Sequence, residues 1–292
     1  MIGHHLANLA NETQNKYSVS VSEIDASLIF DTKFTNFSIY SEGRQIFHVP
    51  KLNVSFSLFS LLSESTTLNF TALYKSGEIA GKIVFNIANS QIKLESVDLT
   101  LKKITLAELE FLTNYMATSK YPVNFTGTID GSVYASLDKD ARSSEADINL
   151  KIRNVKTEAI PVKAMNQNIP ALELTDARSF IEINMMLENS KLTITNIAFP
   201  GPDLKLNITG NARIDREYRI VRMDIDGKFS FSDQIAKNFP LITLLEPFKS
   251  PDGSYPLSMK GSGTRPKIQI GEMNLSDMLN PQPDLINQPA DE

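Results

Sequence analysis

The stretch Lys51-Leu52-Asn53-Val54-Ser55-Phe56-Ser57-Leu58 alternates polar and apolar residues without interruption. Side chains on a β-strand point to opposite faces of the sheet at every second residue. The stretch therefore predicts a strand whose apolar face carries Leu52, Val54, Phe56 and Leu58, and whose other face is polar.

The same alternation recurs along most of the chain. Apolar residues at alternate positions of other segments are Phe70; Ile148, Leu150 and Ile152; Leu192 and Ile194; and Met223, Ile225 and Phe229. Such runs are typical of sheets with one apolar and one polar face. The sequence therefore predicts a mainly β protein, and the apolar face of its sheet must lie against something.

Composition limits the classes of protein to consider. The chain has 292 residues, of which 41% are hydrophobic, so a substantial core is available. The net charge is −5 and the Lys and Arg residues are scattered, whereas a nucleic-acid partner normally requires a basic stripe. We therefore expect no nucleic-acid partner. Because the chain has no cysteine, disulfide scaffolds and Cys-based metal or redox sites are excluded.

Membrane-spanning and targeting segments are not visible in this sequence. No apolar run approaches the roughly 18–20 residues that a membrane-spanning helix needs. Residues 1–17 lack the basic segment and the following apolar stretch of a signal peptide.

Short strands separated by turn residues dominate the predicted organisation, so we expect a meander in which sequence neighbours pair antiparallel. In the first half the predicted strands are 19–21, 25–31, 34–40, 45–49, 52–58, 67–74, 78–87 and 91–101. A second meander begins at Val123 and has a polar loop over 138–145 and an irregular stretch over 155–169. Its later strands are predicted at 171–174, 178–187, 191–197, 204–214, 218–231, 255–260 and 266–270.

Three helical segments interrupt the strands. Residues 1–16 predict a short amphipathic helix. Thr105 and Glu108 have the spacing of a capping box, and Leu106, Leu109 and Leu112 follow at helical spacing. A third segment has Ser232 as its expected N-cap, and its buried side is predicted to contain Ile235, Phe239, Ile242 and Leu245. Pro240 within it predicts a kink or two short helices.

The chain is expected to form one elongated β domain over 17–271, made of two loosely similar halves, 17–122 and 123–271. Each half has a run of strands, then a helix, then strands that contain glycine. Residues 272–292 predict a polar C-terminal tail.

Residues that carry chemistry are sparse, and we expect no enzyme, no metal and no cofactor. His4 and His5 are adjacent in a predicted helix and point about 100° apart, which makes a poor metal pair. Asp224 and Asp226 are better explained as the polar face of a strand than as the start of a calcium loop. The Gly261-Ser262-Gly263-Thr264 segment leads into a strand, which favours a tight bend over a phosphate loop.

Three segments resemble known envelope proteins. Ile24 to Ile87, with Phe56-Ser57-Leu58-Phe59-Ser60-Leu61-Leu62, resembles the N-terminal module of AsmA/TamB-like proteins. The run from Leu192 to Phe231 and the closing Lys260-Gly261-Ser262-Gly263-Thr264-Arg265-Pro266-Lys267-Ile268 are similar to the type II secretion system GspN family.

This resemblance implies a long, curved, groove-like antiparallel sheet with an apolar interior. It further implies a periplasmic protein that is anchored to the inner membrane through an N-terminal helix absent from this sequence. Proteins of this kind include some linked to lipid transport, so the implied partners are lipid acyl chains and secretion-system proteins.

We therefore weigh two main hypotheses. In the first, the strands outnumber the helices that could cover them, and the apolar face is a groove for lipid acyl chains. The candidate groove-lining residues are Leu52, Val54, Phe56, Leu58, Phe70, Ile148, Leu150, Ile152, Leu192, Ile194, Met223, Ile225 and Phe229. In the second, the sheet is a packed docking module that recruits a secretion partner through its exposed edge strands. An enzyme built from residues remote in sequence is the weakest alternative.

Overall fold

The architecture is taken from a computed structural model. The structure describes residues 17–27, 31–56, 65–88, 91–110, 112–113, 123–136, 138, 140–162, 167–238 and 240–275. The predicted helix over 1–16, with His4 and His5, lies outside these residues, as do Leu58 and the end of the predicted tail.

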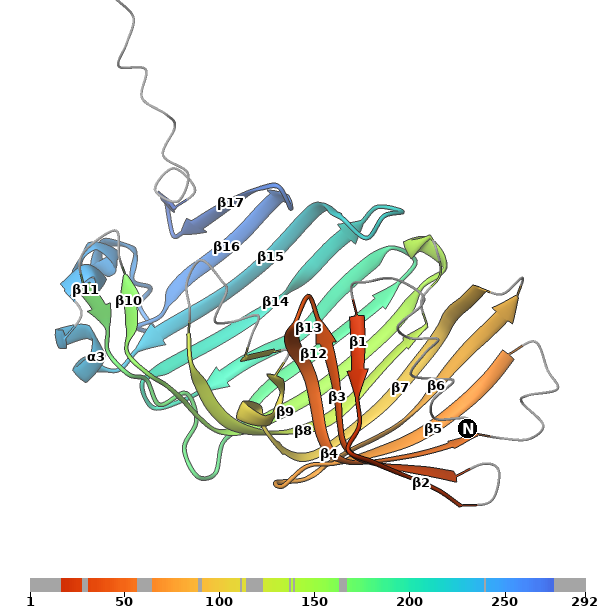
Figure 1. Ribbon diagram of the computed structural model, residues 1–292. Helices are drawn as coiled ribbons and strands as arrows, with labels where there is room; N and C mark the ends of the chain where they lie inside the picture. Colours follow the sequence, from red (N-terminus) through yellow and green to blue (C-terminus); the bar gives the residue numbers. More distant parts are fainter. Residues whose placement is uncertain are drawn as a thin grey trace, which may run out of the picture.

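The described residues form one long antiparallel sheet of 16 strands, which remains open at both edges (Figure 1). The strands of its first half are β1 (Tyr17–Ser20), β2 (Glu23–Ser27), β3 (Asp31–Ser41), β4 (Arg44–Phe56), β5 (Ser65–Leu73), β6 (Glu78–Ala88) and β7 (Gln91–Thr105). Its later strands are β8 (Phe125–Ser136), β9 (Glu145–Thr157), β12 (Ile181–Glu188), β13 (Lys191–Pro200), β14 (Leu204–Ile214), β15 (Ile220–Phe231), β16 (Tyr255–Ser262), β17 (Arg265–Ile270) and β18 (Met273–Asn274).

The strand order from β3 to β9 and from β12 to β18 follows the sequence, which confirms the predicted antiparallel meander. At the first edge, β1 and β2 pair with opposite ends of β3, so they act as one interrupted edge strand. At the other edge, β18 adds Met273 and Asn274 to the sheet, within the segment that the sequence predicts as a tail.

Three strand predictions were wrong. Residues 171–174, predicted as a strand, form only the isolated bridge of Glu173 with Lys156. The segments predicted as separate strands before and after Pro50 form one strand of 13 residues, β4. Pro50 is absent from the register of β4 with β3 and with β5, so its missing N–H removes no bond from either ladder. The stretch predicted as irregular over 155–169 completes β9 and forms a small separate hairpin of β10 (Ile160–Val162) and β11 (Gln167–Ile169).

The helical predictions have mixed outcomes. The segment after Ser232 forms α3 (Asp233–Asn238) and the 3-10 helix η5 (Pro240–Phe248), which confirms the predicted division at Pro240. Ser232 Oγ accepts a hydrogen bond from Ile235 N at 3.3 Å, as an N-cap does. Ile235 and Ile242 are buried as predicted, whereas Phe239 lies outside the described residues.

The capping box at Thr105 was wrong. Thr105 ends β7 and makes no side-chain capping bond, and Leu106–Glu108 form a 3-10 turn, η2. The Glu108 carboxylate instead accepts hydrogen bonds from Ser76 Oγ and from Lys75 N. This carboxylate therefore fixes the β5–β6 turn, and it does not cap a helix.

The two ends of the strands differ in how they are connected. The long connections 106–124, 158–180 and 232–254 all lie at one end, which we name the cap end and which carries α3 and the β10–β11 hairpin (Figure 1). The turns at 137–144, 189–190, 215–219 and 263–264 lie at the opposite end, which we name the hairpin end.

The best-packed core lies at the cap end. Buried members of its largest cluster are Val155, Leu172, Leu174, Ile181, Phe229, Ile235, Ile242, Tyr255 and Ile270. Phe229 stacks on Tyr255 with a centroid distance of 5.3 Å. In a second cluster Leu106 and Leu109 pack against Leu101, Ile104 and Ile129. Both clusters use the chain's long connections to cover part of the apolar face.

Candidate functional site

One face of the sheet carries an apolar row that crosses twelve consecutive strands in register. Its members, from β4 to β17, are Val54, Phe70, Gly81, Leu99, Val133, Ile148, Met185, Ile194, Gly210, Ile225, Met259 and Ile268. Directly paired residues of neighbouring strands lie on the same face. With about 4.8 Å between strands, this row is about 50 Å long when measured along the sheet.

The opposite face is polar over the same strands. Its register includes Asn53 with Thr71, Thr100 with Ser132, and Asn149 with Asn184. The amide of Asn196 links Glu182 and Asn207 by hydrogen bonds of 2.9 and 3.0 Å. The two faces therefore have the sharp difference in polarity that the alternation predicts.

Every described residue of the predicted groove lining lies on the apolar face. Leu52, Ile194, Met223 and Phe229 are buried, with 7% to 8% of each residue exposed. The remaining ones are half-buried, and these are Val54, Phe56, Phe70, Ile148, Leu150, Ile152, Leu192 and Ile225. Phe229 differs from the others because α3 and η5 pack over its cluster.

The apolar face divides into a covered and an open part. Residues near the cap end belong to the clusters under the long connections. A third core cluster contains Val49, Leu52 and Ala72. Another set of residues is half-buried and belongs to none of these three core clusters of the described chain, and we name it the open strip. Its members are Phe56, Leu68, Ile83, Val97, Ile148, Met185, Leu192, Ile208, Ile225 and Met259.

Two loops meet at the hairpin end across the β12–β13 turn. The hydroxyl of Tyr218, in the β14–β15 turn, donates to the carbonyl of Asp138 at 2.5 Å and lies 2.5 Å from Ser144 Oγ. Both partners belong to the β8–β9 loop, in which Ser144 is fully buried. These bonds tie together two turns whose strands are separated by β12 and β13.

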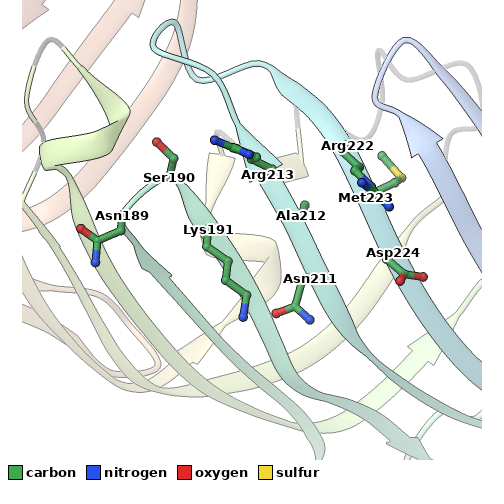
Figure 2. A pocket seen from close by; sticks show the side chains of 9 residues that line it. All are labelled: Asn189, Ser190, Lys191, Asn211, Ala212, Arg213, Arg222, Met223 and Asp224. Atoms are coloured by element: carbon green, nitrogen blue, oxygen red, sulfur yellow. The ribbon is translucent and has the colours of Figure 1, made fainter.

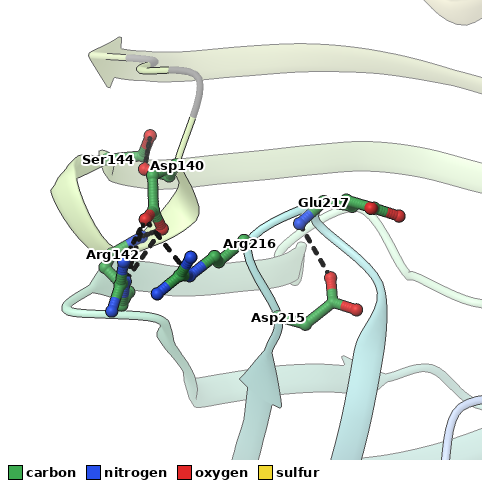
Figure 3. Close-up of polar contacts among 6 residues, drawn as sticks. All are labelled: Asp140, Arg142, Ser144, Asp215, Arg216 and Glu217. Atoms are coloured by element: carbon green, nitrogen blue, oxygen red, sulfur yellow. Dashed lines mark hydrogen bonds and ion pairs between the residues drawn. The ribbon is translucent and has the colours of Figure 1, made fainter.

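Charges reinforce this contact between the loops (Figure 3). The Asp140 carboxylate pairs with Arg142 within its own loop at 2.5 Å and with Arg216 of the β14–β15 turn at 3.7 Å. The hydrogen bond from the Arg142 guanidinium, with smaller contributions from its backbone N–H and from both cations, lowers the pKa of Asp140 to about 2.

A surface hollow of about 440 Å³ lies beside this contact (Figure 2). Three cations line it, Lys191, Arg213 and Arg222, together with Asn189, Ser190, Asn211, Ala212, Met223 and Asp224. Lys191 is paired in register with Arg213, and Arg213 with Arg222. We name these three side chains the cation row.

The local sequence explains the start of this hollow. Asn189 and Ser190 form a two-residue turn with φ values of 51° and 63°. Asn is among the residues that tolerate this left-handed conformation best, and such turns match the twist of a hairpin. The tight turn places Lys191 directly at the hairpin end of β13.

Several described residues whose side chains could carry chemistry have structural partners. His48 Nδ1 lies 2.9 Å from Ser38 Oγ, within β3 and β4. Lys260 pairs with Asp224 at 3.2 Å and with Asp226 at 3.8 Å, so the two carboxylates lie on the polar face as predicted. Gly263 and Thr264 form the turn between β16 and β17, which is the bend expected for the Gly-Ser-Gly-Thr segment.

The described residues offer neither a group of metal ligands nor a membrane-spanning helix. Within the described ranges, no three His, Asp or Glu residues are grouped so that they could hold a metal ion. No helix among the described residues has both the length and the apolar character needed to cross a bilayer.

Sequence reasoning missed two features of the site. Leu99, Met185, Met259 and Ile268 belong to the apolar row and lie in predicted strands, and Val133 lies in the predicted second meander. The cation row was missed because Lys191, Arg213 and Arg222 are far apart in sequence, and only the strand register brings them together.

Comparisons with protein-family models, with curated proteins and with solved structures find no match to this chain. The class of protein that the structure defines is therefore an open, mainly β protein built on one long antiparallel meander.

Proposed function

We propose that this chain is a non-enzymatic envelope protein whose open strip holds the acyl chains of lipids. We further propose that it works in the periplasm as a GspN-like accessory of type II secretion and is anchored to the inner membrane. The secretion role and the location rest on the family resemblance of the sequence. The lipid ligand rests on the apolar face itself.

The observation that carries the proposal is the continuity of the apolar row. It crosses strands β4 to β17 without a polar residue, and the open strip, which shares Ile148, Met185, Ile225 and Met259 with it, is half-buried. Monomeric soluble proteins rarely expose contiguous apolar patches of more than a few hundred Å² without a partner for them. A binding partner with a long apolar body fits such a surface.

An acyl chain gains enough from this surface to stay bound. At about 0.8 kcal/mol per buried methylene, a sixteen-carbon chain gains on the order of 12 kcal/mol before the costs of ordering it. Because the strip continues from strand to strand, a bound chain can shift along it without entering water. The polar headgroup would remain at the rim of the sheet.

The experiment compares two neighbouring methionines on β12. Met185 lies in the apolar row, whereas Met186 is 45% exposed on the polar face. The wild-type protein and the variants Met185→Asp and Met186→Asp are purified without detergent, and bound phospholipid is quantified by native and extraction mass spectrometry. We expect Met185→Asp to carry several-fold less lipid than the wild type, and Met186→Asp to carry the same amount.

Circular dichroism and urea unfolding of both variants separate loss of lipid from loss of fold. A lipid-free wild-type protein would overturn the lipid proposal, and so would equal lipid loads in the two variants. If Met185→Asp unfolds the protein, the strip is a packed interior.

If Met185→Asp unfolds the protein, the docking hypothesis becomes the better one, and one edge of the sheet supports it. Among the described residues, the sheet ends on this side in β18, a strand of two residues that pairs with Gln269 and Ile270 of β17. Strand addition at this edge would recruit a protein partner.

A further inference from the structure

The cation row places three like charges side by side on the polar face of the sheet. Lys191, Arg213 and Arg222 are exposed and adjacent on three neighbouring strands. None of the three forms an ion pair with another described residue. Like charges placed directly opposite each other on a sheet are destabilising. An anion lying over the row would remove this repulsion.

Nearby acids do not neutralise the row. Glu188 is opposite Lys191 in the β12–β13 register but makes no ion pair with it within the described chain. Asp224 is held by Lys260 at 3.2 Å. The chain as a whole has a net charge of −5, so a local excess of positive charge differs from the rest of the molecule.

Exposed apolar side chains lie next to the cation row. Tyr218 is 39% exposed, Ile220 is 37% exposed and Val221 is 45% exposed. They belong to the β14–β15 turn and to the start of β15, and Arg219 and Arg222 lie among them in the sequence. Aromatic, aliphatic and cationic residues in this arrangement are typical of segments that rest in the headgroup region of a bilayer.

The β16–β17 turn lies directly against Ile220, one of these exposed apolar residues. Gly263 N donates to Ile220 O at 3.0 Å, which holds this turn beside the exposed apolar residues. A Cβ at Gly263 would lie 2.7 Å from Ile220 O and 2.8 Å from Ile220 Cβ, so only glycine allows this approach. The turn also carries Arg265, which is exposed.

We propose that the hairpin end of the sheet docks on an anionic phospholipid surface. Lys191, Arg213 and Arg222 bind the lipid phosphates, and Tyr218, Ile220 and Val221 enter the headgroup region. At about 3.3 Å per residue, the cations lie within roughly 10 Å of the turn tips, which is close to the screening length at physiological salt. All of these groups can therefore act on one membrane surface together.

The chemistry favours a bilayer over a soluble anion. A free phosphate or an acidic peptide would use the cations but would leave the three exposed apolar side chains in water. A phospholipid surface satisfies both sets at once. Each cation near such a surface strengthens binding roughly fivefold, so removing three weakens binding by about 100-fold.

The first test measures binding to vesicles. The wild-type protein is sedimented with vesicles of phosphatidylcholine alone and with vesicles that also contain phosphatidylglycerol. The test variant combines Lys191→Gln, Arg213→Gln and Arg222→Gln. The control variant combines Arg44→Gln, Arg178→Gln and Lys205→Gln, which removes the same charge from exposed positions at the cap end.

We expect the wild-type and control proteins to bind only the anionic vesicles, and more weakly as salt is raised. The test variant should lose about 100-fold in affinity while keeping its urea midpoint, because its substitutions relieve repulsion. A wild-type protein that ignores anionic vesicles would overturn the proposal, and so would a control variant that loses as much as the test variant.

A second measurement locates the docking surface directly. The chain has no tryptophan, so Val221→Trp and Leu244→Trp each introduce a single fluorescent reporter. Val221 lies at the hairpin end, and Leu244, which is 55% exposed, lies in η5 at the cap end. We expect anionic vesicles to shift the emission of Val221→Trp to the blue and to leave Leu244→Trp unchanged. The reverse result would place the cap end on the membrane and contradict the proposal.

This inference does not depend on acyl chains being bound to the open strip. Vesicle docking can fail while purified protein still carries lipid, and it can succeed when the protein carries none. The two experiments therefore separate the two proposals.

Discussion

The apolar face of the sheet is covered at the cap end and is only half-buried towards the hairpin end. At the cap end, α3, η5 and the 158–180 connection cover it, and Ile242 and Tyr255 are each only 2% exposed. Towards the hairpin end, the residues of the open strip are half-buried, and the described turns between strands are short.

This difference teaches that a one-layer sheet can be packed at one end of its strands and left open towards the other. The hydrophobic effect stabilises the fold where long connections remove apolar area from water. Where the connections are tight turns, the same face has no cover from the described parts of the chain. Stability is therefore concentrated at the cap end, and the apolar area that no described segment covers lies towards the other end.

The largest expected effect comes from deleting apolar volume at the cap end. Ile181 on β12 is 3% exposed within the largest core cluster. Ile181→Ala should lower the free energy of unfolding by about 3 kcal/mol, because the substitution leaves a cavity among packed neighbours. Urea denaturation followed by circular dichroism measures this loss.

Its matched control is Ile148→Ala on the neighbouring strand β9. Ile148 lies on the same face but is half-buried and outside the core clusters. Its substitution should cost about 1 kcal/mol, since less area is returned to water and no closed cavity forms. Equal losses for the two variants would show that the two ends are packed alike.

A smaller effect is expected at the contact between the two hairpin-end loops. Tyr218→Phe removes the bonds to Asp138 and Ser144 and should cost about 1 kcal/mol. The control is Tyr134→Phe, since Tyr134 is 40% exposed and its hydroxyl makes no hydrogen bond among the described residues. Urea midpoints of the two variants provide the measurement. An unchanged midpoint for Tyr218→Phe would mean that the loops are not tied together in solution.

Much of the fold was predictable because alternation is a local property. The period of two in segments such as 52–58 and 204–214 identifies strands directly, and the regular turns indicate a meander. Pro50 misled the prediction because a proline seldom lies inside a strand, and sequence alone does not show that its position needs no N–H. Thr105 and Glu108 misled it because a capping-box spacing does not reveal that Ser76 binds the carboxylate.

The site was predictable only in part, for a physical reason. Alternation tells which residues share a face within one strand, so Ile148 and Ile225 were correctly assigned to the apolar face. It does not tell which residues become neighbours across strands, because that depends on register. The pairing of Arg213 with Lys191 and Arg222 therefore could not be predicted from sequence alone.

The smallest expected effect compares two carboxylates, half-buried Asp140 at the hairpin end and exposed Asp252 at the cap end. Asp140 at the hairpin end is bound mainly by the charged guanidinium of Arg142, which lowers its pKa to about 2. Asp252 at the cap end is bound mainly by the hydroxyl of Ser254, which also lowers its pKa to about 2. Each carboxylate therefore stabilises the fold at pH values above its unfolded pKa of about 4. This contribution is lost as the pH falls from about 4 through about 2.

Asp140→Asn and Asp252→Asn should each make the urea midpoint fall less steeply between about pH 5 and about pH 2 than it does in the wild type. Added salt distinguishes the two ends. Salt screens the attraction between Asp140 and the guanidinium of Arg142, but it affects the Ser254 hydroxyl bond less, since only the weaker contact of Asp252 with Lys228 is ionic. The difference in the pH dependence of the urea midpoint between wild type and Asp140→Asn should therefore shrink in high salt. The corresponding difference between wild type and Asp252→Asn should persist. If both differences shrink equally, the two carboxylates are held by charge alone, and the ends of the sheet do not differ in this respect.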